Sequence, residues 1–145
     1  MATNIYARLR AGITTASAEE TRAVAAELSA ALPPDTALAL HGDLGVGKTT
    51  FVQGLARGLG ITAQVTSPTF AIYSVYRAGP RTLVHLDGYR LENQKQVDAL
   101  LAEEFLVSPW TLAVEWPEKI HGWLPPGAEH LTLSIRDERH HLQLK

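Results

Sequence analysis

The segment spanning residues 42–49, Gly-Asp-Leu-Gly-Val-Gly-Lys-Thr, restricts the fold of this chain more than any other feature. It matches the pattern G-x-x-x-x-G-K-[ST], whose glycines let the backbone wrap so that successive N–H groups point at phosphate oxygens. An apolar run, Thr36–His41, precedes it directly, and apolar residues follow it at helical spacing. This order predicts a buried parallel strand, a phosphate-binding loop and a helix that begins at Lys48.

Length and composition limit the number of domains, the compartment and the kinds of partner that this chain can have. The chain has 145 residues, 46% of them hydrophobic, which predicts a single domain over residues 1–145. No apolar run is long enough for a bilayer span, no secretory signal is visible, and a cytoplasmic protein is expected. The absence of cysteine excludes disulfides and thiolate metal sites. A net charge of −2 gives no general attraction for nucleic acid, so any contact with RNA is expected to run through a partner or through a local basic patch.

The remaining sequence divides into short elements without linkers or repeats. Residues 5–13 alternate weakly and predict an edge strand. The capping box from Ser17 to Glu20 predicts a helix start, and Pro33 ends that helix. Hairpins are predicted for residues 71–77 with 81–86 and for residues 131–135 with 140–144, a helix for 98–105 and a strand for 111–115. The expected fold class is α/β, a three-layer P-loop NTPase fold with a mixed, centrally parallel sheet and peripheral antiparallel hairpins.

Two carboxylates follow apolar runs and are candidates for the chemistry of the loop. Lys48 is expected to neutralise phosphate charge, and the Thr49 hydroxyl is expected to bind a magnesium ion. Asp87 and Glu115 each end a predicted strand, and ligands in open α/β sheets bind beyond those ends. Either carboxylate can hold the metal while the other orients or deprotonates an attacking water. The sequence leaves this choice open, together with the simpler reading that one of them caps a turn.

Three further residues are candidates for contact with a nucleotide. Ser67 and Thr69 lie between the loop's helix and the next strand, where hydroxyls in nucleotide switches sense the γ-phosphate or the metal. The alternative is an ordinary proline turn with hydroxyl caps. Trp116 directly follows Glu115, and it either closes over the nucleotide or a partner surface or packs at the rim of the domain.

The histidines and Arg90 receive simpler interpretations. His85 lies within an apolar strand and is expected to be a hydrogen-bonded core or rim residue. His140 and His141 have no partner at metal-site spacing and are expected on the surface. Arg90 either reaches a phosphate as an arginine finger or pairs with Glu92, and we favour the surface pair.

Four motifs taken together resemble the TsaE (YjeE) family of small bacterial P-loop ATPases. They are Gly42-Asp-Leu-Gly-Val-Gly-Lys-Thr-Thr50, Ser67-Pro-Thr-Phe70, His85-Leu-Asp-Gly-Tyr-Arg-Leu91 and Val114-Glu-Trp-Pro-Glu118. Their order and spacing agree with the family from about residue 17 to residue 135. Val46 stands where the family commonly has alanine, which is a mild departure.

The resemblance implies an accessory role in making threonylcarbamoyladenosine in tRNA. The protein would bind the TsaD–TsaB heterodimer, meet tRNA only through that complex, and cycle it by binding and slowly hydrolysing ATP with Mg²⁺. It would not itself transfer the threonylcarbamoyl group. Near Ser17, and near Arg136 or Arg139, the chain would flank the adenine. The residues expected to contact ATP are Gly45, Val46, Gly47, Lys48, Thr49, Thr50, Ser67, Thr69 and Trp116. Thr49 and Glu115 would bind magnesium, and Asp87 would be needed for hydrolysis while also being a candidate metal ligand. Lys48, Asp87 and Glu115 form the expected catalytic set.

Other functional classes make different demands on the sequence. A small nucleotide or metabolite kinase is the main alternative, but it needs a second substrate pocket and usually an arginine-bearing lid, and no Arg-rich insertion is visible. A regulatory GTPase would read guanine through Asn-Lys-x-Asp, which the stretch from Asn93 to Lys95 does not supply. A binding module with an inactive loop is the remaining alternative.

Overall fold

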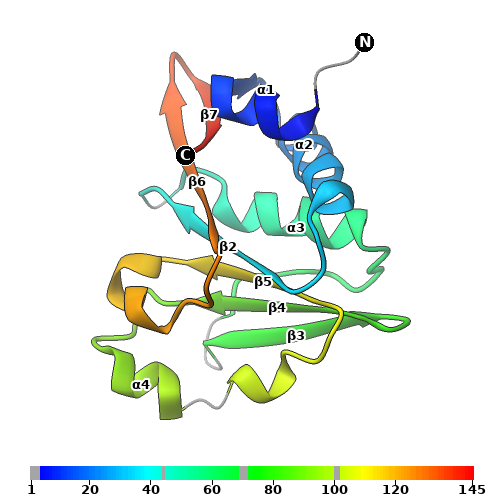
Figure 1. Cartoon of the computed structure of the whole chain (residues 1–145). Coiled ribbons are helices and arrows are strands. Elements are labelled where there is room, and N and C mark those ends of the chain that lie inside the picture. Colours follow the sequence, from blue (N-terminus) through cyan, green and yellow to red (C-terminus); the bar gives the residue numbers. More distant parts are fainter. Residues whose placement is uncertain (1–3, 44, 69–71, 100–101) are drawn as a thin grey trace.

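Helices lie on both faces of a seven-stranded sheet in the computed structural model of this chain (Figure 1). The structure describes residues 4–43, 45–68, 72–99 and 102–145. The strand order is β1-β7-β6-β2-β5-β4-β3. In chain order the strands are β1 Ile13–Thr15, β2 Thr36–His41, β3 Tyr73–Ala78, β4 Arg81–Asp87, β5 Trp110–Glu115, β6 Glu129–Arg136 and β7 Arg139–Leu144.

The centre of the sheet is parallel and its two sides are antiparallel. Strands β6, β2, β5 and β4 pair in parallel, whereas β3 pairs antiparallel with β4, and β7 with both β6 and β1. Both predicted hairpins are therefore confirmed, as is the fold class of a mixed, centrally parallel sheet with peripheral antiparallel pairs. The parallel register sets Asp87 opposite Glu115 at the carboxyl ends of β4 and β5.

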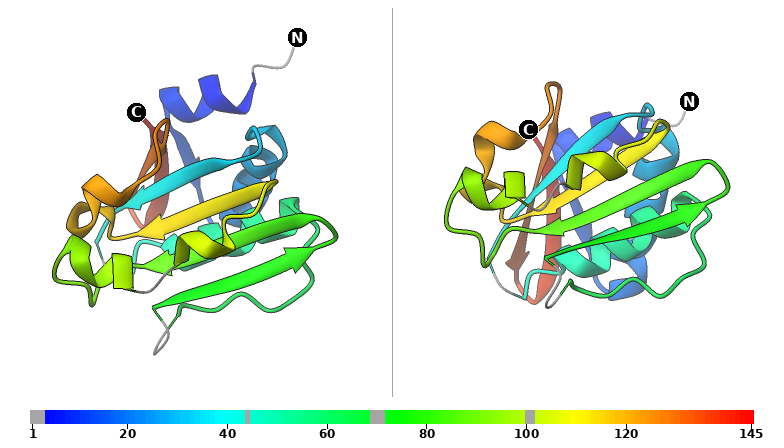
Figure 2. Two further views of the ribbon diagram at one scale, coloured as in Figure 1. Left: turned by 60° about the horizontal axis from the view of Figure 1, so that its bottom comes forward. Right: turned by 90° about the horizontal axis from the view of Figure 1, so that it is seen from below.

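The helices divide into two layers around two hydrophobic cores. Helices α1 Ile5–Ala11, α2 Ala18–Ala31 and α3 Lys48–Gly58 share one core with the sheet, which includes Leu38 and Phe51. On the other face, α4 Gln94–Ala99 and 3₁₀ turns at Ala102–Phe105, Pro117–Lys119 and His121–Trp123 surround a core that includes Val84 and Ile120. Figure 2 shows α2 and α3 on one side of the sheet and α4 with the short turns on the other. In the described part of the chain, no helix is long and apolar enough to cross a membrane.

The helix starts follow from local side-chain chemistry. Ser17 Oγ accepts the N–H of Glu20 at 3.1 Å, and the Glu20 carboxylate reaches back to the N–H of Ala16. This confirms the predicted capping box. The helix then ends at Ala31, just before Pro33, as predicted.

Two sequence predictions were wrong. Residues 5–13 are not an edge strand: residues 5–11 form α1, and β1 begins only at Ile13. The Asn4 side chain accepts the N–H of Ala7, and Ile5 and Leu9 bury one helical face, so capping and a spacing of four outweigh the weak alternation. The helix expected at residues 98–105 begins earlier, at Gln94, and residues 102–105 form a separate 3₁₀ turn.

Gly54 lets α3 approach α2 more closely than any other residue would allow. A Cβ atom there would lie 2.5 Å from the Cβ of Ala25 and would press on the Arg22 carbonyl oxygen. Alanine normally stabilises a helix by about 1 kcal/mol relative to glycine, whereas overpacking a tight interface costs roughly 1–3 kcal/mol.

We therefore expect Gly54→Ala to lower the free energy of unfolding by up to about 2 kcal/mol, which is the overpacking cost less the gain in helix propensity. Urea denaturation followed by circular dichroism would measure the change. Arg57→Ala is the matched control, because it places the same residue on the exposed face of α3 and removes only a surface ion pair with Glu19, a kind of pair that contributes little to stability. A Gly54→Ala variant as stable as the wild type would show that the helices separate without cost.

Candidate functional site

The loop between β2 and α3 has the backbone shape that its glycines predict. Gly42, Gly45 and Gly47 have φ values of +145°, +82° and +93°. A Cβ on Gly42 would lie 2.5 Å from the Leu133 carbonyl oxygen, so this position has no room for a side chain. Space beside Gly45 is open. Since α3 begins at Lys48, its first unpaired N–H groups and the positive end of its dipole face the loop.

A cavity of about 400 Å³ lies against this loop, at the carboxyl ends of the central strands. It brings together most of the residues that the sequence nominated. Val46 is buried, and its side chain lies against Gly42 rather than in the cavity. Thr69 falls outside the described residues. The lining residues are Gly45, Gly47, Lys48, Thr49, Thr50, Ser67, Asp87, Tyr89, Glu115 and Trp116.

Lys48 is almost entirely buried within this site. Only 5% of the residue is exposed, and its ammonium group donates a hydrogen bond to the Gly42 carbonyl oxygen at 2.6 Å. The same nitrogen lies 3.6 Å from the centroid of the Trp116 ring, a cation–π contact. Burial lowers the pKa of Lys48, and the nearby carboxylates of Glu115 and Asp87 oppose that shift. The site therefore contains a partly desolvated cation whose attraction for an anion is weakly screened.

Trp116 and Tyr89 form an aromatic wall beside that cation. Trp116 has φ +56° and ψ +52°, a left-handed conformation that costs a residue other than glycine about 1 kcal/mol or more. Its ring lies 5.1 Å from the Tyr89 ring, and Lys119 donates to the Tyr89 carbonyl oxygen at 2.6 Å. The turn therefore aims the indole ring at Lys48. Sequence reasoning did not include Tyr89 in the site, although its position two residues after Asp87 was visible.

The two carboxylates have different surroundings, although they are neighbours in the sheet. Glu115 is 4% exposed, and its Oε2 lies 3.3 Å from the donating Thr49 hydroxyl and 2.5 Å from His85 Nε2. Asp87 accepts from the Ser67 hydroxyl at 3.4 Å and from the Tyr89 N–H at 3.0 Å. Glu115 thus belongs with the first turn of α3, whereas Asp87 belongs with the Ser67 segment.

The donor set limits what could bind here. Backbone N–H groups and Lys48 suit phosphate oxygens, while the Thr49 hydroxyl and Glu115 carboxylate are hard oxygen ligands. In the described residues, no group of three or more His, Cys, Asp or Glu side chains is arranged to hold a metal ion. A divalent ion would need ligands from phosphate and water as well, which is the usual way in which Mg²⁺ is bound.

His140 is closer to the loop than the sequence predicted. It was expected on the surface, but it is half-buried, and its Nδ1 lies 3.0 Å from the Val46 carbonyl oxygen. The reason is topological: β7 pairs with β6, which adjoins β2, so the last hairpin passes beside the loop. No local sequence signal indicates this contact. The predicted pairing of Arg90 with Glu92 stays a prediction.

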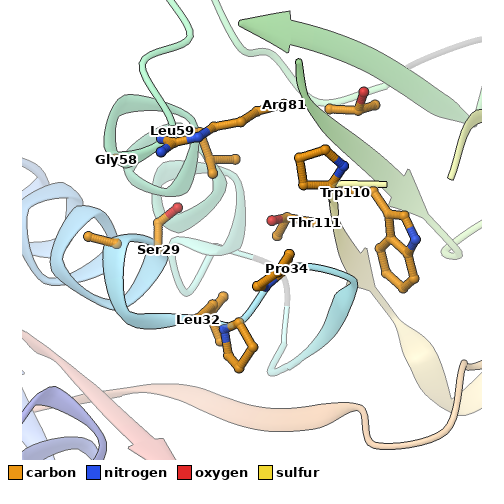
Figure 3. Close-up of a pocket in the computed structure, with 12 residues that line it drawn as sticks. Ser29, Leu32, Pro34, Gly58, Leu59, Arg81, Trp110 and Thr111 are labelled. Carbon is orange, nitrogen blue, oxygen red and sulfur yellow. The ribbon is translucent and has the colours of Figure 1, made fainter. Parts of the chain in front are cut away.

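A second hollow, of about 370 Å³, lies at the opposite end of the sheet (Figure 3). It sits between the ends of α2 and α3 and the starts of β4 and β5, and Arg81 is the only charged side chain among its described lining residues. In Figure 3, Arg81 extends toward the end of α3, where helix carbonyls favour a cation. This hollow has neither the glycine cradle nor the carboxylates of the first, which is therefore the candidate site.

A cluster of histidines that no sequence pattern predicted lies just before the loop. His41 ends β2, and its Nε2 lies 2.9 Å from His130 Nδ1 on β6. Its other ring nitrogen lies 3.8 Å from the Glu118 carboxylate. Burial lowers the pKa of His41, the charges of His130, Lys145 and His121 lower it further, and Glu118 opposes them.

We expect this cluster to make the folded state less stable in mild acid. Because the folded pKa of His41 lies below its unfolded value of 6.5, the unfolded chain binds the proton more readily. The stabilising contribution is complete above the unfolded pKa and is lost as pH falls through 6.5 toward the folded pKa. Melting temperatures between about pH 7.5 and pH 5.5 should fall more steeply for the wild type than for His41→Gln. Identical slopes would contradict this prediction.

Comparisons with known proteins agree with the geometry. A family model described as "Threonylcarbamoyl adenosine biosynthesis protein TsaE" matches residues 15–143. Two curated relatives carry the name tRNA threonylcarbamoyladenosine biosynthesis protein TsaE. The relative from Synechocystis sp. is 48% identical over 98 residues, which cover 65% of this chain and 62% of the relative, somewhat less than two thirds of its length. The relative from Bacillus subtilis is 42% identical over 129 residues, covering 86% of this chain and 79% of the relative.

A solved structure supports the same assignment of the fold. The crystal structure of Bacillus subtilis YdiB superposes with a TM-score of 0.72 and 36% sequence identity. The match covers 92% of this chain and 82% of that one. The similarity therefore extends over nearly the whole sheet and its helices.

Proposed function

This chain belongs to the TsaE family of threonylcarbamoyladenosine biosynthesis proteins, and from that premise we propose that it binds and weakly hydrolyses ATP as an accessory protein for this tRNA modification. The observation that carries the proposal is the single cavity that joins the glycine loop, Lys48, Thr49 and the carboxylates of Asp87 and Glu115. These groups supply an anion cradle, a cation and hard oxygen ligands at one place.

The residues present fit ATP and Mg²⁺. The backbone of residues 45–50 and the Lys48 ammonium would hold the phosphates, and the open space beside Gly45 leaves room for a close approach. Thr49 and Glu115 would hold Mg²⁺, which supplies charge neutralisation on the phosphates when bound. Ser67 and Trp116 would line the nucleotide, and we keep Thr69 in this proposed set from its sequence position.

Asp87 is suited to orient or deprotonate a water molecule. It lies at the cavity, and hydrogen bonds from the Ser67 hydroxyl and the Tyr89 N–H fix its two oxygens. A carboxylate held in this way can accept a proton, provided that a water lies within hydrogen-bond reach. Because Ser67 donates to Asp87, a shift of the Ser67 segment would alter the carboxylate, which supports a switch role for this segment.

We propose that the partners are the TsaD and TsaB proteins and that the chain acts in the cytoplasm. Family membership supports this partnership, and the net charge of −2 supports an indirect contact with tRNA, through the complex. Tyr89 is 46% exposed beside Trp116, so a partner that covers this wall would contact a group next to Lys48. Nucleotide binding and partner binding would then be coupled.

The main alternative, a small kinase, finds little support in the described residues. A kinase needs room for a phosphoryl acceptor beside the cavity. The adjoining hollow, lined by Ser67, Asp87 and Arg90 among others, holds about 150 Å³, which is below the roughly 300–1,000 Å³ of ordinary ligand pockets.

Phosphate release from ATP, measured with and without TsaD–TsaB, would test the proposed function. We expect Mg²⁺-dependent turnover below about 1 s⁻¹ for the chain alone, slower than ordinary enzymes, and a changed rate with the partners. Complementation of tRNA modification in a strain that lacks its own family member would test the cellular role. Absence of nucleotide binding would refute the proposal, and phosphoryl transfer to a nucleoside would support the kinase instead.

A further inference from the structure

His85 lies behind Glu115, deep within the sheet, and makes a single described polar contact. The residue is 0% exposed, and its Nε2 lies 2.5 Å from Glu115 Oε2. The register places His85 opposite Ala113 and Asp87 opposite Glu115. Because side chains alternate along a strand, His85 and Glu115 occupy the face that packs on α3. Glu115 therefore lies between the ring of His85 and the Thr49 hydroxyl.

The second ring nitrogen of His85 indicates where the ring proton is. Among the described residues, Nδ1 has no hydrogen-bond partner, and it is buried. A proton on Nδ1 would create a buried donor without an acceptor, which is unfavourable. A proton on Nε2 is instead donated to the Glu115 carboxylate. When that carboxylate is ionised, its oxygens act only as hydrogen-bond acceptors. The arrangement thus favours one tautomer and one direction for this hydrogen bond.

We propose that His85 is a positioning residue that holds the Glu115 carboxylate against Thr49 for a divalent cation. The inference rests on the proposed function, in which Thr49 and Glu115 are the metal ligands. His85 fixes Oε2 from behind and leaves Oε1 of Glu115 without a described side-chain partner, so one oxygen is oriented while the other remains available. Outer groups of this kind orient ligating carboxylates and commonly change metal affinity 10- to 100-fold when removed, by order of magnitude.

Three substitutions at His85 separate positioning from simple packing. The amide nitrogen of Gln can take the place of Nε2, so His85→Gln keeps a donor toward Glu115. His85→Asn carries the same amide one methylene shorter and cannot reach. His85→Phe fills similar space without any donor. If the Phe variant fails to fold, the comparison of Gln with Asn still tests the proposal.

The experiment measures the affinity of the non-hydrolysable analogue AMP-PNP by calorimetry, with Mg²⁺ and with EDTA. We expect His85→Phe and His85→Asn to reduce the apparent Mg²⁺ affinity by about 10- to 100-fold, and His85→Gln to reduce it by no more than about threefold. Binding in EDTA should stay within about twofold for every variant, because His85 does not touch the loop. A purely structural role would instead lower melting temperature and EDTA binding together.

The outcomes distinguish this inference from the proposed function. A wild-type chain that binds no nucleotide, or gains nothing from Mg²⁺, overturns the proposed function and this inference with it. If Mg²⁺ clearly raises the affinity of the wild type for AMP-PNP, and His85→Phe and His85→Asn keep that increase, only the role of His85 is overturned. Equal losses of Mg²⁺ affinity in His85→Gln and His85→Asn would also overturn the role of His85, since a donor toward Glu115 would then make no difference.

Discussion

Lys48→Ala is expected to reduce the affinity for ATP at least about 30-fold, because removing one member of a buried charge pair costs roughly 2–5 kcal/mol. Lys48 is almost fully buried, with its ammonium group between the Gly42 carbonyl and the Trp116 ring. No other ammonium or guanidinium group lines the described part of this cavity. Titration of AMP-PNP by calorimetry would measure the loss.

Two further variants show whether the effect comes from charge at this place. Lys95→Ala removes an equal charge from the exposed surface of α4 and should leave the affinity unchanged. Lys48→Arg keeps the charge but needs space for a planar guanidinium group between Gly42 and Trp116, so we expect it to bind poorly as well. If Lys48→Ala binds ATP as tightly as the wild type, the assignment of the phosphate site is wrong.

The parts of the fold that the sequence predicted are those with strong local signals. The strand before Gly42, the helix from Lys48 and the capping box at Ser17 each rest on neighbouring residues, and each is confirmed. The weak alternation of residues 5–13 was a poor guide, because a short segment fits a helical spacing of four equally well. The cap at Asn4 decided the outcome.

For the candidate site, strand topology predicts some residue positions, whereas others depend on tertiary packing. Asp87 and Glu115 end parallel strands, so their meeting at one edge of the sheet could be expected from the topology alone. The contact of His140 with Val46 could not, because it depends on how the last hairpin is placed beside β2. The cation–π contact of Trp116 could not be predicted either, because it depends on a left-handed turn.

The two carboxylates, whose roles the residues alone left open and the family resemblance divided, also have different partners in the structure. Thr49 donates to Glu115, whereas Ser67 donates to Asp87. In the proposed function, a metal ligand should lie beside the hydroxyl at the start of α3, and a residue that acts on water should lie beside the proposed switch segment at Ser67. Replacing Glu115 by its amide should therefore impair Mg²⁺-dependent binding, whereas replacing Asp87 by its amide should impair hydrolysis.

We expect Glu115→Gln to weaken Mg²⁺-dependent binding of AMP-PNP at least about 10-fold, because the amide lacks the negative charge that holds the cation. Asp87→Asn should bind AMP-PNP with Mg²⁺ nearly as the wild type does, yet hydrolyse ATP about 100-fold more slowly or worse, since it cannot accept a proton from water. Calorimetry and phosphate release on the same preparations would give both quantities.

Glu118→Gln is the matched control: Glu118 is exposed beside His41 and does not line the cavity, so neither quantity should change. Equal losses of Mg²⁺ binding in Glu115→Gln and Asp87→Asn would mean that both carboxylates hold the metal, and the division of roles drawn from Thr49 and Ser67 would be wrong.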